Sequence, residues 1–287
     1  MIGLCTDSLI ANIPLMKIAS YYGADNVDWY YPLNHLNYEK IYYSKIFNFT
    51  YKLDRQGEMI TGGTGHDLKK KLPGDIEKCQ PEYKIYRDCD YSLQYFSRGC
   101  IRKCPFCVVY EKEGFIYPVE PMNLNPNGKF IRVFDNNFFA NPQWREAIEY
   151  LRKMNQPVEF NSGIDVRIFD EEQGAALKKI KKSGYLHIAW DNPRQDLRSK
   201  IKEMIKYVSK HRILCYVLIG YDSTQEEDLY RCESLRDLGV MPFVMPYNKK
   251  DEYQRRFARW ANHKAIFKSV KWKDYRKNAC KKHNIVV

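Results

Sequence analysis

The sequence has no apolar run near the roughly 18 residues that a membrane-spanning helix needs, and it carries no lipidation signal. Its N-terminus also lacks the charged segment, apolar stretch and cleavage site of a secretory signal peptide. These absences favour a cytoplasmic protein without a membrane partner. In that compartment the nine cysteines are expected to be reduced thiols, because disulfides are rare there.

The sequence has fewer acidic than basic residues. There are 47 Lys and Arg against 35 Asp and Glu, which gives a net charge of +12. This excess favours a polyanionic partner such as nucleic acid, although it also fits a basic surface that only keeps the protein soluble. Because 44% of the residues are hydrophobic and 15% are aromatic, the chain can bury a core and long disordered regions are not expected.

Short apolar runs recur at intervals of 27 to 29 residues from residue 131 onward. They cover residues 131–134, 158–160, 186–190, 213–219 and 242–245. Segments with helical periodicity lie between them, which predicts parallel strands joined by right-handed helical crossovers. With a further run at 93–96, the pattern predicts an α/β fold whose main part is a partial (β/α)6 TIM-type barrel over residues 91–250. The carboxyl ends of its strands would form the working edge.

The two flanking regions follow other patterns. Strands at residues 2–5, 27–31 and 41–47, with a helix around 15–22, predict a small doubly wound α/β domain. Thr61 to Gly65 are then expected to form a turn and residues 66–91 a linker, which completes a first domain over residues 1–90. Residues 251–287 mix aromatic and basic side chains and predict a basic helical appendage.

Three cysteines follow the first predicted barrel strand. Cys100, Cys104 and Cys107 are spaced C-x-x-x-C-x-x-C, and three thiolates this close together can ligate one metal ion or iron-sulfur cluster. A structural zinc site usually has four protein ligands, whereas three ligands leave one position open for chemistry. The alternative is a zinc site whose fourth ligand is Cys89 or a distant histidine.

The sequence R-G-C-I-R-K-C-P-F-C at 98–107, with F-D-N-N at 134–137 and A-W-D-N at 189–192, resembles the radical S-adenosylmethionine superfamily, in particular a group of phage and bacterial members. The resemblance implies that the three cysteines hold a 4Fe-4S cluster and that S-adenosylmethionine chelates its fourth iron. One electron, from a reductant such as flavodoxin or ferredoxin, would then cleave S-adenosylmethionine to methionine and a 5′-deoxyadenosyl radical.

The resemblance also implies contacts to S-adenosylmethionine at the strand ends. The expected residues are Phe106, Asp135, Asn136, Asn137, Asn161, Ser162, Asp165, Arg167, Trp190, Gly220 and Phe243. Residues 135–137 would hydrogen-bond the ammonium group, and the segment up to Arg167 would lie near the ribose and carboxylate. A structural ion pair between Asp165 and Arg167 is the alternative for those two side chains.

The first domain resembles the vestigial flavodoxin-like, cobalamin-binding-type domain that precedes the barrel in many members. No D-x-H-x-x-G arrangement is present around His35 or His66, so no cobalamin is expected. The tRNA methylthiotransferases, a second resemblance, hold another cluster on three further cysteines. Cys5, Cys79 and Cys89 match that count but not the spacing, and the β-rich C-terminal module of that family is missing. Ordinary thiols are the other interpretation of these three residues.

The resulting prediction is a radical S-adenosylmethionine enzyme that modifies a nucleic acid or nucleotide. The nucleic-acid part of this prediction rests on the net charge, on the cations Arg98, Arg102 and Lys103 around the cysteines, and on a basic tail whose aromatic rings could stack on bases. That tail could instead be an amphipathic helix packed on the barrel. The alternatives for function are a peptide or small-metabolite substrate, or a non-catalytic protein stabilised by a cluster or zinc. Nothing in the sequence predicts an oligomeric state.

Overall fold

The computed structural model describes residues 1–50 and 59–275. The chain forms two compact units, a first unit up to Arg132 and a second unit from Val133 onward. Both contain parallel strands and helices, so the predicted α/β class is confirmed. The division into residues 1–90, 91–250 and 251–287 stays a prediction. Within the described residues, no helix is both long and apolar enough to cross a membrane.

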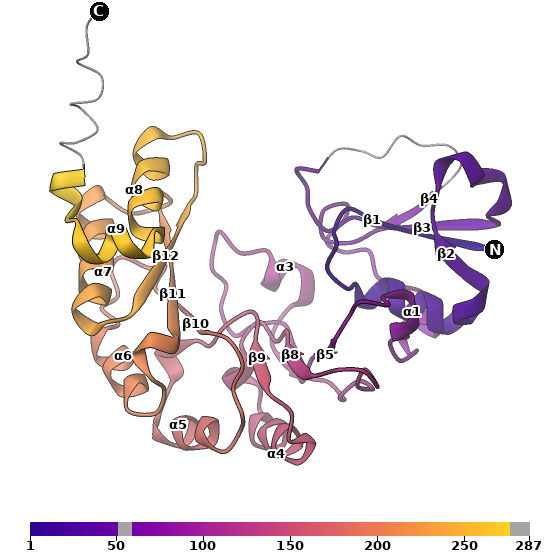
Figure 1. Ribbon diagram of the computed structural model, residues 1–287, viewed down its shortest axis with the longest axis horizontal. Helices are drawn as coiled ribbons and strands as arrows, with labels where there is room; N and C mark the ends of the chain where they lie inside the picture. The colour runs from indigo at the N-terminus through magenta and orange to yellow at the C-terminus, as the bar shows by residue number, and fades with distance from the viewer. Residues whose placement is uncertain (51–58, 276–287) are drawn as a thin grey trace, which may run out of the picture. The chain divides into compact units, whose positions relative to one another are not determined.

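The first unit contains a parallel four-stranded sheet in the order β2-β1-β3-β4 (Figure 1). The strands are β1 (Ile2–Thr6), β2 (Val27–Trp29), β3 (Lys40–Ser44) and β4 (Met59–Gly62). Helix α1 (Ile13–Tyr22) begins where the side chain of Asn12 accepts a hydrogen bond from the Leu15 N–H at 3.1 Å. It buries Leu15 and Ile18 against Leu4 and Tyr42, and this packing forms the apolar core of the sheet.

Three predicted boundaries in this sheet are wrong. The strand expected over 27–31 ends at Trp29. The expected turn at 61–65 begins only at Gly63, because Thr61 and Gly62 still pair with β3 in strand β4. The strand expected to reach residue 47 ends at Ser44, because the Asp7 carboxylate accepts hydrogen bonds from the Ile46 N–H at 2.7 Å and the Phe47 N–H at 3.0 Å. A side-chain acceptor thus replaces the neighbouring strand there.

The remainder of the first unit contains short elements. They are α2 (Gly74–Glu77), the 3-10 turn Tyr83–Ile85, β5 (Tyr91–Gln94), β6 (Ser97–Arg98), α3 (Val109–Glu113), β7 (Tyr117–Pro118) and β8 (Phe130–Val133). β5 lies next to β8, through which the chain leads into the second unit. β6 and β7 form an antiparallel pair and close a hairpin that carries the three motif cysteines.

The second unit repeats strand and helix as the apolar runs predict. Its strands are β9 (Val158–Phe160), β10 (Leu186–Ala189), β11 (Ile213–Ile219) and β12 (Met241–Pro246). Its helices are α4 (Trp144–Met154), α5 (Glu171–Lys178), α6 (Arg198–Ile205), α7 (Gln225–Leu238), α8 (Glu252–Asn262) and α9 (Lys264–Ser269). Strands β10, β11 and β12 form a parallel sheet. The parallel bridge between Ile164 and Ile188 joins the loop after β9 to β10.

Residues alternate between the two faces of β11. Cys215 and Val217 are fully buried, while Leu214, Tyr216 and Leu218 are only half-buried on the other face. Helices α6 and α7 lie along one side of these strands in Figure 1. The other face of the β10-β11-β12 sheet is therefore the more open one.

The C-terminal helices pack on the last strand. The side chain of Asn262 accepts a hydrogen bond from the Val244 N–H at 2.6 Å and donates one to the Val244 carbonyl at 3.0 Å, which ties α8 to β12. Four tail aromatics are buried: Phe257, Trp260, Phe267 and Trp272. The packed amphipathic helix is thus confirmed up to residue 275, and these four rings are core rather than base-stacking surfaces. The last predicted residues of the tail, 276–287, lie outside the described residues.

Candidate functional site

The three motif cysteines lie in one loop of the first unit, between β6 and α3. At the base of this loop Arg98 pairs with Tyr117 across the β6-β7 hairpin, and the Cys100 N–H donates to the Gly114 carbonyl at 3.2 Å. The cysteines therefore lie on a segment whose two ends are joined by backbone hydrogen bonds. Phe106, between the second and third cysteines, is 37% exposed.

Gly99 is required where the first arm of the hairpin approaches the backbone of Gly114 and Phe115. Its φ is +79°, a conformation that side-chain-bearing residues rarely adopt. A Cβ at this position would also lie 2.5 Å from the Phe115 carbonyl oxygen and 2.7 Å from the Gly114 carbonyl oxygen. The glycine immediately before Cys100 is therefore fixed by backbone geometry and by close packing.

A carboxylate clamps the two ends of the cysteine segment. Glu113, the last residue of α3, accepts a hydrogen bond from Arg98 Nη2 at 2.5 Å and from the Gly99 N–H at 2.9 Å. The Arg98 guanidinium lies over the Tyr95 ring, 4.2 Å from its centre. Glu113 was not predicted, because nothing in its spacing distinguishes it from a solvent-exposed helix residue.

The three motif cysteines differ in their hydrogen bonds and in their exposure to solvent. Cys100 Sγ accepts a hydrogen bond from the Arg102 N–H at 3.4 Å, and the Cys107 N–H donates to the Cys104 carbonyl at 3.0 Å in a tight turn. Cys100 and Cys104 are half-buried and Cys107 is exposed. Hydrogen bonds to sulfur and solvent exposure are two of the factors that set the potential of an iron-sulfur cluster.

The donor set fits an iron-sulfur cluster by residue type and number, since three thiolates within eight residues are soft ligands. In the part of the chain that the structure describes, no three His, Cys, Asp or Glu side chains are already gathered as a metal site. Loading therefore requires the loop to bring its sulfur atoms together. The loop between residues 99 and 108 contains no helix or strand.

Cys5, Cys79 and Cys89 lie in three separate segments. Cys5 is buried in β1, and this burial raises the pKa of its thiol to about 11, so the thiol stays protonated at neutral pH. The Cys79 thiol donates to the Asp75 carbonyl at 3.4 Å and the Cys89 thiol donates to the Tyr91 carbonyl at 3.3 Å. These surroundings favour the interpretation as ordinary thiols.

In the second unit, Asp165 organises part of the predicted S-adenosylmethionine site. Its carboxylate accepts Arg167 Nε at 2.5 Å and Nη2 at 3.0 Å, and it accepts Asn137 Nδ2 at 3.2 Å. The ion pair considered from the sequence is therefore formed. The Asp165 side chain is 6% exposed and that of Arg167 is 27% exposed.

The loops after β8 and β9 are joined to each other. The Asn161 N–H donates to the Val133 carbonyl at 2.9 Å, and Ser162 Oγ donates to the Phe134 carbonyl at 3.3 Å. Asn161 and Ser162 are exposed, whereas Asp135 and Asn137 are buried and Asn136 is half-buried. The structure thus brings the predicted residues 135–137 and 161–167 together at one edge of the second unit.

Of the other three predicted residues, only Phe243 has an exposed side chain. Trp190 is 1% exposed, and its indole Nε1 donates to the Gln195 carbonyl at 2.6 Å, so its ring belongs to the core. Gly220 has a φ of +72°, and a Cβ there would collide with the side chain of Gln254 from α8. Phe243 is 42% exposed on β12.

A row of rings on the open face of the sheet was missed by the sequence analysis. His187 stacks on Tyr216 with ring centres 5.2 Å apart and planes at 18°, and Tyr216 contacts Phe243 edge to face at 5.7 Å. His187 was hidden inside an apolar run. The signal that could have found the row is the period of two along the runs 186–190 and 213–219, which places every second residue on one face of the sheet.

Comparison with known proteins gives no family assignment: no protein-family model matches the chain, and no curated protein matches it either.

Proposed function

We propose that this chain is a radical S-adenosylmethionine enzyme that acts on a nucleic acid or nucleotide. The observation that carries the proposal is the cysteine loop, in which three thiols within eight residues lie in a hairpin clamped by Glu113. When bound, a 4Fe-4S cluster on these residues would supply the electron that cleaves S-adenosylmethionine to a 5′-deoxyadenosyl radical. A flavodoxin or ferredoxin is the proposed reductant, and the expectation of no cobalamin stays a prediction.

The residues of the loop would have distinct tasks. Cys100, Cys104 and Cys107 lose their protons to become ligands, so binding releases protons. Gly99 and Glu113 hold the base of the hairpin. The Arg102 N–H already points at the Cys100 sulfur and would stabilise negative charge on it.

The alternation of strands and helices over residues 91–250, with the six strands β5, β8, β9, β10, β11 and β12, supports a partial (β/α)6 barrel with its working edge at the strand ends. Arg167 is proposed to bind the carboxylate of S-adenosylmethionine, because a guanidinium pairs with carboxylates bidentately. Asp165 would hold that guanidinium in orientation. The rings of His187, Tyr216 and Phe243 offer a surface for a planar group.

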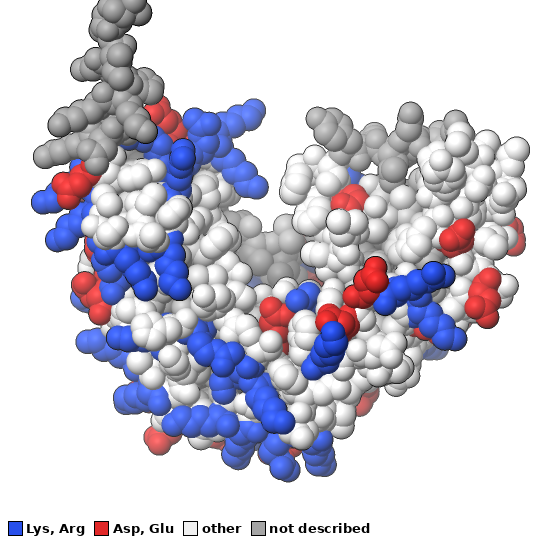
Figure 2. Space-filling model, viewed as in Figure 1, with Lys and Arg blue, Asp and Glu red and all other residues white. Residues whose placement is uncertain are grey.

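Charge supports the nucleic-acid substrate. Lys and Arg side chains gather over the helices of the second unit in Figure 2. Exposed cations of α8, α9 and the following turn include Arg255, Arg259, Lys264, Lys268 and Lys271. Because the tail aromatics are buried, this part of the chain would attract phosphates without stacking on bases.

Anaerobic reconstitution tests the proposal. We expect about four irons per chain and a reduced-cluster electron paramagnetic resonance signal that changes on addition of S-adenosylmethionine. Cys100→Ala, Cys104→Ala and Cys107→Ala should each lose the cluster, whereas Cys79→Ala, a half-buried thiol of the same unit, should keep it. One zinc per chain would contradict the proposal, and so would a cluster whose signal ignores S-adenosylmethionine.

A further inference from the structure

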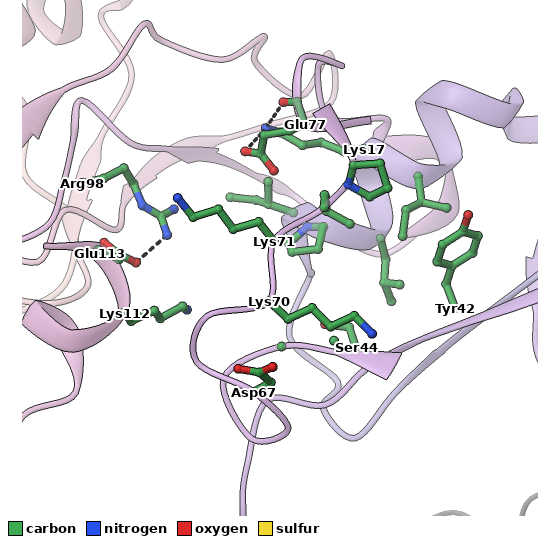
Figure 3. Close-up of a pocket in the computed structure, with 18 of the residues that line it drawn as sticks. Lys17, Tyr42, Ser44, Asp67, Lys70, Lys71, Glu77, Arg98, Lys112 and Glu113 are labelled. Atoms are coloured by element: carbon green, nitrogen blue, oxygen red, sulfur yellow. Dashed lines mark hydrogen bonds and ion pairs between the residues drawn. The ribbon is translucent and has the colours of Figure 1, made fainter. Parts of the chain in front are cut away.

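The first unit contains a cavity of about 590 Å³ at the edge of its parallel sheet (Figure 3). Ser44 at the end of β3, Gly62 at the end of β4 and Ile13 at the start of α1 line it. Cavities of about 300–1,000 Å³ are the usual size of small-molecule sites. All residues that line it belong to the first unit, so the cavity does not depend on the second unit.

The topology of the sheet supports a ligand at this place. In the order β2-β1-β3-β4, the chain leaves β1 toward β2 on one side and then crosses to β3 on the other. Doubly wound sheets bind ligands outside the carboxyl ends of the strands, near such a reversal of strand order. The cavity lies at the carboxyl ends of β3 and β4, next to the first turn of α1.

Five cationic side chains line the cavity wall. The cations that line it are Lys17, Lys70, Lys71, Arg98 and Lys112. Two of them are already neutralised, since Lys17 pairs with Glu77 at 2.8 Å and Arg98 pairs with Glu113 at 2.5 Å.

The other three cations, Lys70, Lys71 and Lys112, form no ion pair with a carboxylate among the described residues. Lys112 Nζ donates to the neutral Thr64 hydroxyl at 2.7 Å, and burial lowers the pKa of this amine. Among the described residues, Lys70 and Lys71 make no ion pair. Four carboxylates also line the wall: Glu77 and Glu113, which are the ion-pair partners already named, and Asp67 and Glu120. Asp67 accepts the Lys69 N–H at 2.8 Å.

Lys70 and Lys71 point toward opposite ends of the cavity (Figure 3). In Figure 3 the side chain of Lys71 points toward Arg98, whereas Lys70 points the other way, toward Ser44. At that end Glu113 already neutralises Arg98, which leaves Lys71 and Lys112 as cations that form no ion pair with a described residue. Their two positive charges make this end the better place for an anionic group.

The remaining wall is apolar. Leu15, Ile18, Tyr42, Ile60 and Leu72 line the cavity. Ile60 and Leu72 are accessible, whereas the other three belong to the core of the sheet. A ligand that fits must combine an apolar or planar part with a compact, strongly negative group. A phosphate suits the cationic end better than a single carboxylate, because it carries more charge and more acceptor oxygens and lysine is a common phosphate binder.

We propose that this cavity binds a small phosphorylated molecule of the nucleoside-phosphate class, with its phosphate at Lys71 and Lys112 and its apolar part against Ile60 and Leu72. The proposal goes beyond the cluster-dependent function, because the cavity is complete in the first unit without a cluster. The same Glu113 that clamps the cysteine segment also lines this cavity, so a bound phosphate would lie near the base of the hairpin.

Titration calorimetry on the full-length, cluster-free protein near 0.15 M salt tests this, with ADP, adenosine and succinate as probes. ADP should bind at least about tenfold more tightly than adenosine, because the phosphates supply the charge-assisted hydrogen bonds. Lys71→Gln and Lys112→Gln should each weaken ADP binding by at least about fivefold. Lys69→Gln is the matched control, since Lys69 is the adjacent exposed lysine outside the cavity wall, and it should leave ADP binding within about twofold.

Several outcomes would overturn the proposal: no ADP binding, succinate binding as tightly as ADP, or equal losses in the Lys69 and Lys71 variants. Unfolding temperatures of all three variants show whether a loss of binding is a loss of folding, and Lys71 is exposed enough that its variant should fold. Because the measurement needs no cluster, its failure would leave the proposed radical chemistry untouched.

Discussion

Glu113 and Arg98 form a 2.5 Å ion pair that joins the two ends of the cysteine-bearing segment. The Arg98 side chain is 29% exposed and that of Glu113 is 10% exposed, so this pair is less screened by water than most surface pairs. The second oxygen of Glu113 holds the Gly99 N–H directly before Cys100. The geometry of the first thiol therefore depends on a carboxylate 13 residues further along the chain.

Glu113→Ala should reduce iron loading during reconstitution and lower the free energy of unfolding by about 1–2 kcal/mol, because Arg98 and the Gly99 N–H lose their acceptor. Iron content and urea denaturation measure the two effects. Glu111→Ala, an exposed residue of the same helix, is the control and should change neither. Equal iron content in both variants would show that the clamp does not matter for loading.

Gly99→Ala should destabilise the protein by about 1–2 kcal/mol or more, because the residue has a positive φ and its Cβ would collide with two carbonyl oxygens. Denaturant midpoints would measure this. Gly74→Ala, at the start of α2, is the matched control, because a Cβ there has no atom within 4 Å. We expect this variant to lose no stability. A Gly99→Ala protein as stable as the parent would rule out the close approach of Gly99 to the Gly114 and Phe115 carbonyl oxygens.

Arg167→Lys should weaken S-adenosylmethionine binding by about tenfold, because lysine cannot reproduce the bidentate geometry of a guanidinium. Equilibrium dialysis of the reconstituted protein measures the affinity directly. Arg145→Lys alters another bidentate pair, with Glu172 on the surface of α4 and α5, and should have no effect. If both variants bound S-adenosylmethionine as the parent does, Arg167 would be only a structural partner of Asp165.

Trp260→Ala should cost about 3–5 kcal/mol of stability, because its ring is fully buried among Phe257, Phe267 and Trp272. The exposed Tyr185 is the control ring in the same unit, and Tyr185→Ala should stay within about 0.5 kcal/mol. Thermal unfolding measures both. A Trp260→Ala protein with unchanged stability but lost RNA binding would restore the base-stacking interpretation of the tail.

The strands of the second unit were predictable because each is a short apolar run at a regular interval. Residues 158–160 and 213–219 match β9 and β11 in full. β4 was missed because its glycine resembles a turn signal, and only pairing with β3 shows that Gly62 still belongs to the strand.

Only those parts of the site that have a characteristic residue spacing could be predicted from the sequence. The cysteine motif has a recognisable spacing, whereas Glu113, His187 and Tyr216 act through contacts with residues distant in the chain. Lys70 and Lys71 lie in what the sequence presents as a linker, and their role as cavity wall depends on how residues 59–73 fold back on β3 and α1. Long-range packing of this kind leaves no local pattern.

The most direct test of the central claim is the amount of 5′-deoxyadenosine that the reconstituted protein forms from S-adenosylmethionine and dithionite without oxygen. We predict its formation by the parent protein and by Cys79→Ala, and its loss to background in the variant that lacks Cys100, Cys104 and Cys107. A protein that bound about four irons per chain and formed no 5′-deoxyadenosine would contradict the account.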